Sequence, residues 1–161
     1  MQIDRRISHG ARARLSFGEL TTAELFFLWA LRERFDTGPG SMLLVGAFRR
    51  VFGLAAVEGA LAAFECMFTI LLQHLTREAR VLSPECVQVS RDELLLLHAF
   101  AALQAERTPH VQSIARTLVG PVWACALCQW AREFGSYMSE RELVLPLRGL
   151  ATLVSSPTQL H

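Results

Sequence analysis

Apolar residues recur at helical spacing along most of the chain, and this pattern predicts an all-α protein with six main helices. The expected helices start after residues 21, 41, 53, 90, 108 and 121. The third, from Leu54 to about Arg80, is apolar on nearly every face, so we expect it to be long and central. The segment from Val81 to Val89 contains Pro84 and is expected to be a connector or a short strand.

Two helix starts carry the same N-terminal signature. Thr21-Thr22-Ala23-Glu24 and Ser90-Arg91-Asp92-Glu93 are both capping boxes, in which a hydroxyl and a glutamate three residues later satisfy free backbone amides. Aligning the boxes also brings Gly53 close to Gly120, with one two-residue deletion in a loop. We therefore predict an internal duplication of a three-helix unit, covering residues 21–80 and 90–135.

The ends of the chain are less apolar than its centre. Residues 1–20 hold Arg5, Arg6, Arg12 and Arg14 with few apolar anchors, which predicts a flexible basic arm. Residues 21–150 are expected to form a single helical domain. Residues 151–161 are rich in Ser, Thr and Pro, as is typical of a disordered tail.

Composition favours a soluble protein with apolar side chains to spare. Hydrophobic residues make up 52% of the chain and charged residues 19%, so we expect part of the apolar surface to meet a partner. The 16 basic and 15 acidic residues nearly cancel, which provides no global field for nucleic acid or an anionic membrane. No secretory signal is visible, and Glu58 and Glu65 interrupt the most membrane-like run, so we expect a cytoplasmic protein that does not enter a membrane.

No common catalytic or phosphate-binding motif is present, and we expect a non-catalytic protein without a cofactor. Cys125-x-x-Cys128 is the sharpest local signal, although it supplies only half of a zinc site. On a helical wheel both thiols fall opposite the predicted core stripe of Trp123, Leu127, Trp130 and Phe134. They are weak candidates for metal or redox chemistry, and the alternative is that they pack as small apolar residues against another helix or subunit.

Single polar residues on the apolar helices offer further candidates. Glu58 and Glu65 lie seven apart on the third helix and align with Cys125 and Arg132 in the second unit. They suit either a solvated strip or a Glu65–Arg132 pair between repeats or subunits. His74, His98 and His110 lie on different predicted helices, and we expect His98, among leucines, to be a hydrogen-bonded residue of the core or its boundary.

The second unit also resembles, loosely, the helix-turn-helix of winged-helix regulators. The resemblance lies in ELLLLHAFAAL, then SIARTLVG, then a helix ending in WAREFG, and covers about a third of the chain. In that family the helix after the turn presents polar and basic side chains to base edges. Here residues 121–128 offer no bidentate donor, so the motif looks degenerate and DNA binding is not favoured.

These observations leave three functional hypotheses. The first is a non-catalytic helical module for protein interaction or regulation, acting through an apolar interface, most simply as a homodimer or with another protein. The second is a nucleic-acid-binding regulator related to winged-helix proteins. The third is a metal, redox or small-ligand sensor that uses Cys125 and Cys128.

Overall fold

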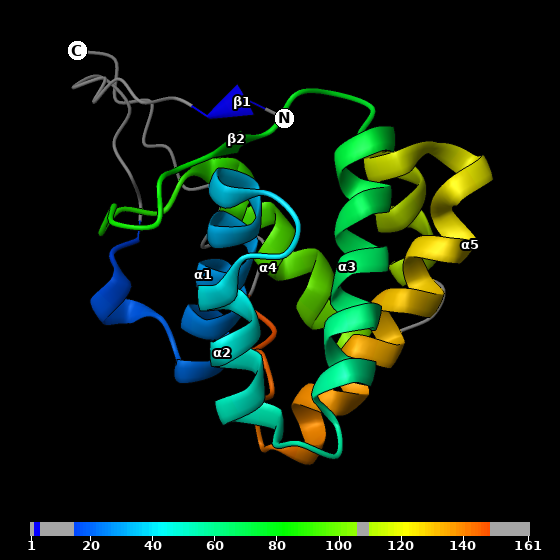
Figure 1. Ribbon diagram of the computed structural model, residues 1–161. Helices are drawn as coiled ribbons and strands as arrows, with labels where there is room; N and C mark the ends of the chain where they lie inside the picture. Colours follow the sequence, from blue (N-terminus) through cyan, green and yellow to red (C-terminus); the bar gives the residue numbers. More distant parts are fainter. Residues whose placement is uncertain (1, 4–14, 106–109, 149–161) are drawn as a thin grey trace, which may run out of the picture.

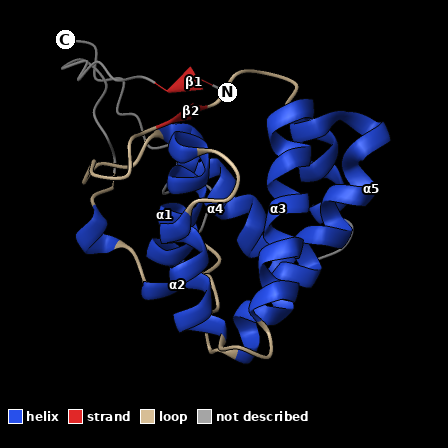
Figure 2. Cartoon of the chain, viewed as in Figure 1, coloured by secondary structure: helices blue, strands red, loops and turns tan. Residues whose placement is uncertain are grey.

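The computed structural model describes residues 2–3, 15–105 and 110–148, and it is mostly helical, as the apolar pattern predicts. Five α-helices are assigned in these ranges (Figure 2). They are α1 (Thr22–Thr37), α2 (Met42–Phe52), α3 (Val57–His74), α4 (Arg91–Gln104) and α5 (His110–Glu140). The expected tail at 151–161 and most of the basic arm lie outside the described residues.

Both predicted capping boxes are present. Thr21 Oγ1 accepts from the Glu24 amide at 3.2 Å, and Glu24 Oε2 accepts from the Thr21 amide at 2.8 Å. Ser90 and Glu93 repeat the arrangement at 3.1 and 2.8 Å. The starts of α1 and α4 are therefore fixed by the same local chemistry.

The third helix is shorter than predicted. We expected it to run from Leu54 to about Arg80, whereas α3 spans Val57–His74. Beyond it, the Thr76 amide donates to the Leu118 carbonyl at 2.8 Å and Thr76 Oγ1 donates to the Thr117 carbonyl at 2.7 Å. These tertiary hydrogen bonds replace the next helical ones, so the chain leaves the helix although its apolar composition continues.

The prediction of six separate helices is not confirmed, because the fifth and sixth are joined in α5. Gly120 inside α5 is not helical, with φ 78° and ψ 169°, and Pro121 follows it. Gly53, which ends α2, has φ 78° and ψ 168°. This left-handed φ strains any residue with a Cβ atom, so glycine suits both turns. The helix then continues past Phe134, where we expected its end, because Gly135 packs closely on Gln104 and Met138 is buried.

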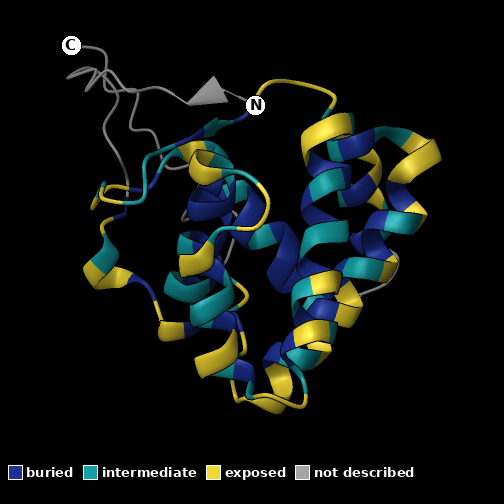
Figure 3. Cartoon of the chain, in the orientation of Figure 1, coloured by how far each residue is buried: buried dark blue, intermediate teal, exposed yellow. Residues whose placement is uncertain are grey.

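Helices α3 and α5 lie side by side and form one half of the molecule (Figure 1). Helices α1 and α2 lie on the other side, and α4 runs between, packing on α5 and on α1. The ring centroids of Phe27 in α1 and Phe100 in α4 are 4.3 Å apart and the rings are stacked. The two halves meet in an aromatic core, in which Phe134 contacts Phe48, Phe64 and Phe100. Figure 3 shows these inward faces buried. Among the described residues most apolar side chains of α3 and α4 are covered within the chain, while Leu72 of α3 stays exposed.

The connector between α3 and α4 carries a short parallel pairing, of β2 (Arg80–Val81) with β1 (Gln2–Ile3). The end of the predicted flexible arm also packs here, so residues 15–20 belong to the folded part. The Phe17 amide donates to the Val87 carbonyl at 3.1 Å, and Leu15 and Leu20 are buried. The prediction missed this because it treated residues 1–20 as one segment, although the few apolar residues of that segment include Leu15, Phe17 and Leu20 near its end.

One helix in the described part of the chain, α5, is long and apolar enough to cross a membrane by length and composition alone. Core helices pass the same test, so the observation is weak evidence. In this structure α5 is kinked at Gly120 and buries Leu127 and Phe134 against the rest of the chain.

Candidate ligand pocket between α4 and α5

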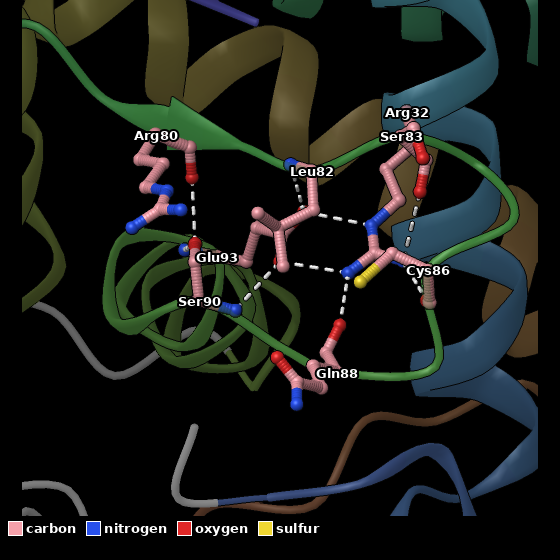
Figure 4. Close-up of polar contacts among 8 residues, drawn as sticks. All are labelled: Arg32, Arg80, Leu82, Ser83, Cys86, Gln88, Ser90 and Glu93. Carbon is pink, nitrogen blue, oxygen red and sulfur yellow. Dashed lines mark hydrogen bonds and ion pairs between the residues drawn. The ribbon is translucent and has the colours of Figure 1, made fainter. Parts of the chain in front are cut away.

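A buried ion pair fixes the start of α4 against α1. Arg32 of α1 donates from Nε to Glu93 Oε1 at 2.7 Å and from Nη2 to Glu93 Oε2 at 2.9 Å. Both side chains are 0% exposed. Glu93 is the capping-box glutamate of α4, so a single carboxylate caps the helix and binds the arginine (Figure 4).

The same guanidinium organises the connector. Arg32 donates to the carbonyls of Ser83, Cys86 and Gln88, while Glu93 Oε1 accepts from the Leu82 amide at 2.9 Å (Figure 4). With the two bonds to Glu93, these contacts match the five N–H groups of a guanidinium. A buried charge is tolerated when it is paired and hydrogen-bonded in this way, so we assign the pair a structural role.

Beside the Arg32–Glu93 ion pair, a pocket of about 330 Å³ opens between α4, the first part of α5 and residues 75–79. Its wall is largely apolar, and its members are Leu75, Ala79, Leu95, Leu96, Ala99, Ile114 and Leu118. The polar side chains that also line it are Thr76, Arg77, Asp92, His98, His110, Ser113 and Thr117. A concave, apolar site of this size with a few polar groups is typical of small-molecule binding.

At one side of the pocket Asp92 is already satisfied. Its Oδ1 accepts from Arg77 Nη2 at 2.6 Å and its Oδ2 accepts from the Arg80 amide at 2.8 Å. The carboxylate therefore serves to hold residues 77–80 against α4. Its charge is offset by Arg77, so the two together add little net charge to the pocket.

His98 lines the pocket from α4. Both ring nitrogens are buried, and neither makes a hydrogen bond of normal geometry among the described residues. Its ring lies 6.2 Å from that of His110, at an interplanar angle of 76°. We expected a hydrogen-bonded histidine here, and the structure realises this only in part, because the backbone of Arg148 interacts with the imidazole without normal hydrogen-bond geometry.

The surroundings of His98 favour its neutral form. Desolvation by burial lowers the pKa of His98 below its usual value of 6.5, and the nearby charge of His110 lowers it further. The backbone of Arg148 acts in the opposite direction but more weakly. The neutral imidazole offers one N–H donor and one acceptor nitrogen.

A second, larger depression of about 620 Å³ lies on the outer face of α5. Its lining consists of Gln112, Ser113, Arg116 and Thr117, which are all polar and belong to one helix. The depression is open, and the described residues provide no apolar wall from a second element, so it encloses a ligand poorly. The pocket beside His98 is the better candidate.

The two cysteines of the predicted motif do not share a surface. Cys125 is exposed, whereas Cys128 is 3% exposed and lies in the core. Burial raises the pKa of the Cys128 thiol, with Arg132 acting more weakly against it, so the thiolate that metal or redox chemistry requires is disfavoured. The helical wheel placed Cys128 on the outer side because it centred the core stripe on Trp123, which is 39% exposed. All four cysteines lie within the described residues, and none forms a disulfide.

The other predicted polar residues are dispersed. Glu58 and Arg132 are exposed. Glu65 is bound within the chain by Arg34 of α1, whose Nε lies 2.9 and 2.7 Å from its two oxygens, so its observed partner is not the Arg132 that we proposed. The described part of the chain brings together no three His, Cys, Asp or Glu side chains that could hold a metal ion.

Sequence reasoning missed the pocket because its residues come from three separate segments. The available signal was a histidine within an apolar helix face, and a second histidine at the start of the next helix. Their proximity depends on how α4 and α5 pack, which periodicity does not specify.

The sequence matches no protein-family model, and comparisons with curated proteins and with solved structures find no match.

Proposed function

We propose that this chain is a non-catalytic regulatory module that binds a small apolar molecule in the pocket between α4 and α5. The observation that carries the proposal is His98, whose two buried ring nitrogens make no hydrogen bond of normal geometry at the wall of a largely apolar pocket. Leaving buried polar atoms without partners costs about 1–3 kcal/mol each, and a ligand with a polar group would remove that cost.

Size supports a ligand of modest dimensions. An engineered apolar cavity of about 150 Å³ holds benzene. The pocket of about 330 Å³ therefore suits a molecule roughly twice that size. An eight-carbon alcohol, 1-octanol, is a suitable probe.

The test compares 1-octanol binding to the wild type and to His98→Trp by isothermal calorimetry. The indole fills the pocket, so we expect binding to the wild type and none to the variant. Gln129→Trp is the matched control, because it adds the same side chain to an exposed position on α5 outside the pocket, and it should bind normally. Equal affinities for the three proteins, or no binding to any of them, would refute the proposal.

A second candidate is the protein-interaction module, favoured by exposed apolar residues where α3 ends and α5 kinks. Val122 is 81% exposed, Leu72 is 42% exposed, and Trp123 stacks on His74 at 3.9 Å while remaining 39% exposed. We propose that this surface contacts the same surface of a second copy of the chain, because a homodimer is the simplest closed assembly. Analytical ultracentrifugation at micromolar concentration tests it: the wild type should be a dimer and Val122→Arg a monomer.

We also propose that the chain arose by an internal duplication. Its support is the pair of capping boxes and the nearly equal backbone angles of Gly53 and Gly120. We propose that residues 21–80 and 90–135 descend from one three-helix unit, and that the second unit kept an open space, which residues 75–79 at the end of the first unit help to enclose. Different handedness in the two halves after superposition would contradict it.

Two alternatives find less support. The surface after Gly120 carries Val122 and Trp123 in place of the basic side chains that read bases, so nucleic-acid binding stays a weaker proposal. A sensor that uses both cysteines would require Cys128 to leave the core. A cytoplasmic location remains the proposed one, and reduced thiols would be consistent with it.

A further inference from the structure

We propose that the pocket beside His98 selects apolar carboxylic acids, whose carboxylate lies against His98 and His110 and is bound together with a proton. This inference rests on the proposed function and adds the chemical class of the ligand. It follows from which charged groups around the pocket are already paired, and from the closeness of the two imidazole rings.

The charged groups that face His98 cancel in pairs. Arg77, from residues 75–79, is paired with Asp92 of α4 at 2.6 Å. On the other side of His98, Arg148 is paired with Glu24 of α1 at 2.7 Å, and both line a small space next to the imidazole. With these charges offset, the two imidazoles decide which head group the pocket prefers.

Two imidazoles at 6.2 Å suit a group with two acceptor atoms. A carboxylate offers one oxygen to each ring, whereas an alcohol has a single oxygen and an ammonium group accepts no hydrogen bond. Hydrogen bonds to an ionised group are also the stronger ones, particularly where water is excluded. The apolar wall of Leu95, Leu96 and Ile114 holds the rest of such a ligand.

The attraction between a bound carboxylate and the imidazoles predicts that His98 takes up a proton when the ligand binds. In the free protein burial and the charge of His110 keep His98 neutral. An anion beside the pair favours the imidazolium form, so the pKa of His98 rises when the ligand binds. Affinity must then increase as pH falls from 8 to 6, while a carboxylic acid with a pKa of about 4–5 stays ionised.

Calorimetric titration with octanoate, 1-octanol and octylamine tests the inference. At pH 6 we expect octanoate to bind about tenfold more tightly than 1-octanol and octylamine to bind worst. Between pH 6 and pH 8 octanoate should weaken by about tenfold or more, as expected for release of one proton, while 1-octanol changes little.

Three variants test which histidine is responsible for the pH-dependent binding of octanoate. His98→Gln should remove the pH dependence, because glutamine fills a similar volume without titrating. His110→Gln changes an exposed side chain at the start of α5 and should weaken octanoate binding several-fold. His74→Gln is the matched control, since His74 stacks on Trp123 outside the pocket, and it should bind as the wild type does.

The two levels of the proposal fail differently. If 1-octanol or octylamine binds as tightly as octanoate at pH 6, or if octanoate binding is independent of pH, the carboxylate inference is overturned and the apolar pocket stands. If none of the three probes binds, the proposed function itself fails.

Discussion

The pair α1–α2 and the pair formed by α4 and the first part of α5 start from the same local chemistry but differ in how they are filled. In the first pair Phe26 contacts Phe48 at 5.5 Å and Phe52 at 5.8 Å, and Trp29 packs on the core. In the second pair Leu95 and His98 border a pocket of about 330 Å³. Similar helical frames can thus be closed by aromatic rings or left open.

Counting from the two capping boxes makes the difference specific. Trp29 and His98 each lie eight residues after the N-cap, Thr21 or Ser90. Under the proposed duplication, an indole in the first unit corresponds to an imidazole in the second. We propose that side chains at such positions decide whether the unit has a cavity.

The two capping glutamates offer a second contrast. Glu93 is held by Arg32 with both side chains 0% exposed, whereas Glu24 is held by Arg148 with side chains 2% and 25% exposed. The first pair lies within the core, and the second closes the surface between α1 and the segment after α5. We expect them to contribute very differently to stability.

The largest expected effect comes from breaking the buried pair. Arg32→Leu leaves Glu93 charged and unpaired in the core, which should cost about 3–5 kcal/mol of the free energy of unfolding. Arg148→Leu removes the partly exposed partner of Glu24 and should cost only about 1 kcal/mol. Urea denaturation of both variants measures the difference. Equal losses of unfolding free energy in the two variants would show that burial does not distinguish the Arg32–Glu93 pair from the Arg148–Glu24 pair.

A smaller effect is expected from opening the first unit. Trp29→His gives α1 the residue that α4 has and removes part of an aromatic side chain from the core, which should cost about 2 kcal/mol. Urea denaturation measures the loss, with Trp123→His as the control on a half-exposed tryptophan. A loss no greater than that of the control would mean that Trp29 does not close the first unit.

The smallest expected effect is a difference in acid sensitivity. Burial alone would raise the pKa of Glu24, but hydrogen bonds from Arg148 and Thr21 and the charge of Arg148 together lower it below 4.5. The stability that Glu24 provides is therefore complete above about pH 4.5 and is lost as pH falls through the lower, folded-state pKa. Arg148→Leu should lose less stability than the wild type between pH 5 and pH 3 in urea titrations, and an unchanged pH profile would contradict this assignment.

Much of the fold could be predicted from the sequence, because it depends on local signals. Capping residues and helical periodicity specify where α1, α2 and α4 begin, and the glycines mark the turns at Gly53 and Gly120. The end of α3 could not be predicted, since it depends on hydrogen bonds from Thr76 to Thr117 and Leu118 across the fold.

The candidate site was less accessible for the same reason. A helical wheel shows which residues share a face but not which face a neighbour covers. The wheel therefore predicts Cys128 outside the core, whereas its side chain is buried. It also gives no information on the hydrogen bonds of His98. Arg32 and Glu93 lie 61 residues apart, and no periodicity links them. Tertiary pairing of this kind is set by packing and becomes visible only in the folded chain.

Chemical-shift mapping tests the central claim most directly, that the second unit holds a ligand where the first is closed. Titrating the ¹⁵N-labelled protein with 1-octanol should shift the amide signals of the pocket wall, including Leu95, Ile114 and Leu118, and leave those of Phe26, Ala47 and Val51 in the first unit unchanged. Shifts confined to the first unit, or no shifts at saturating 1-octanol, would contradict it.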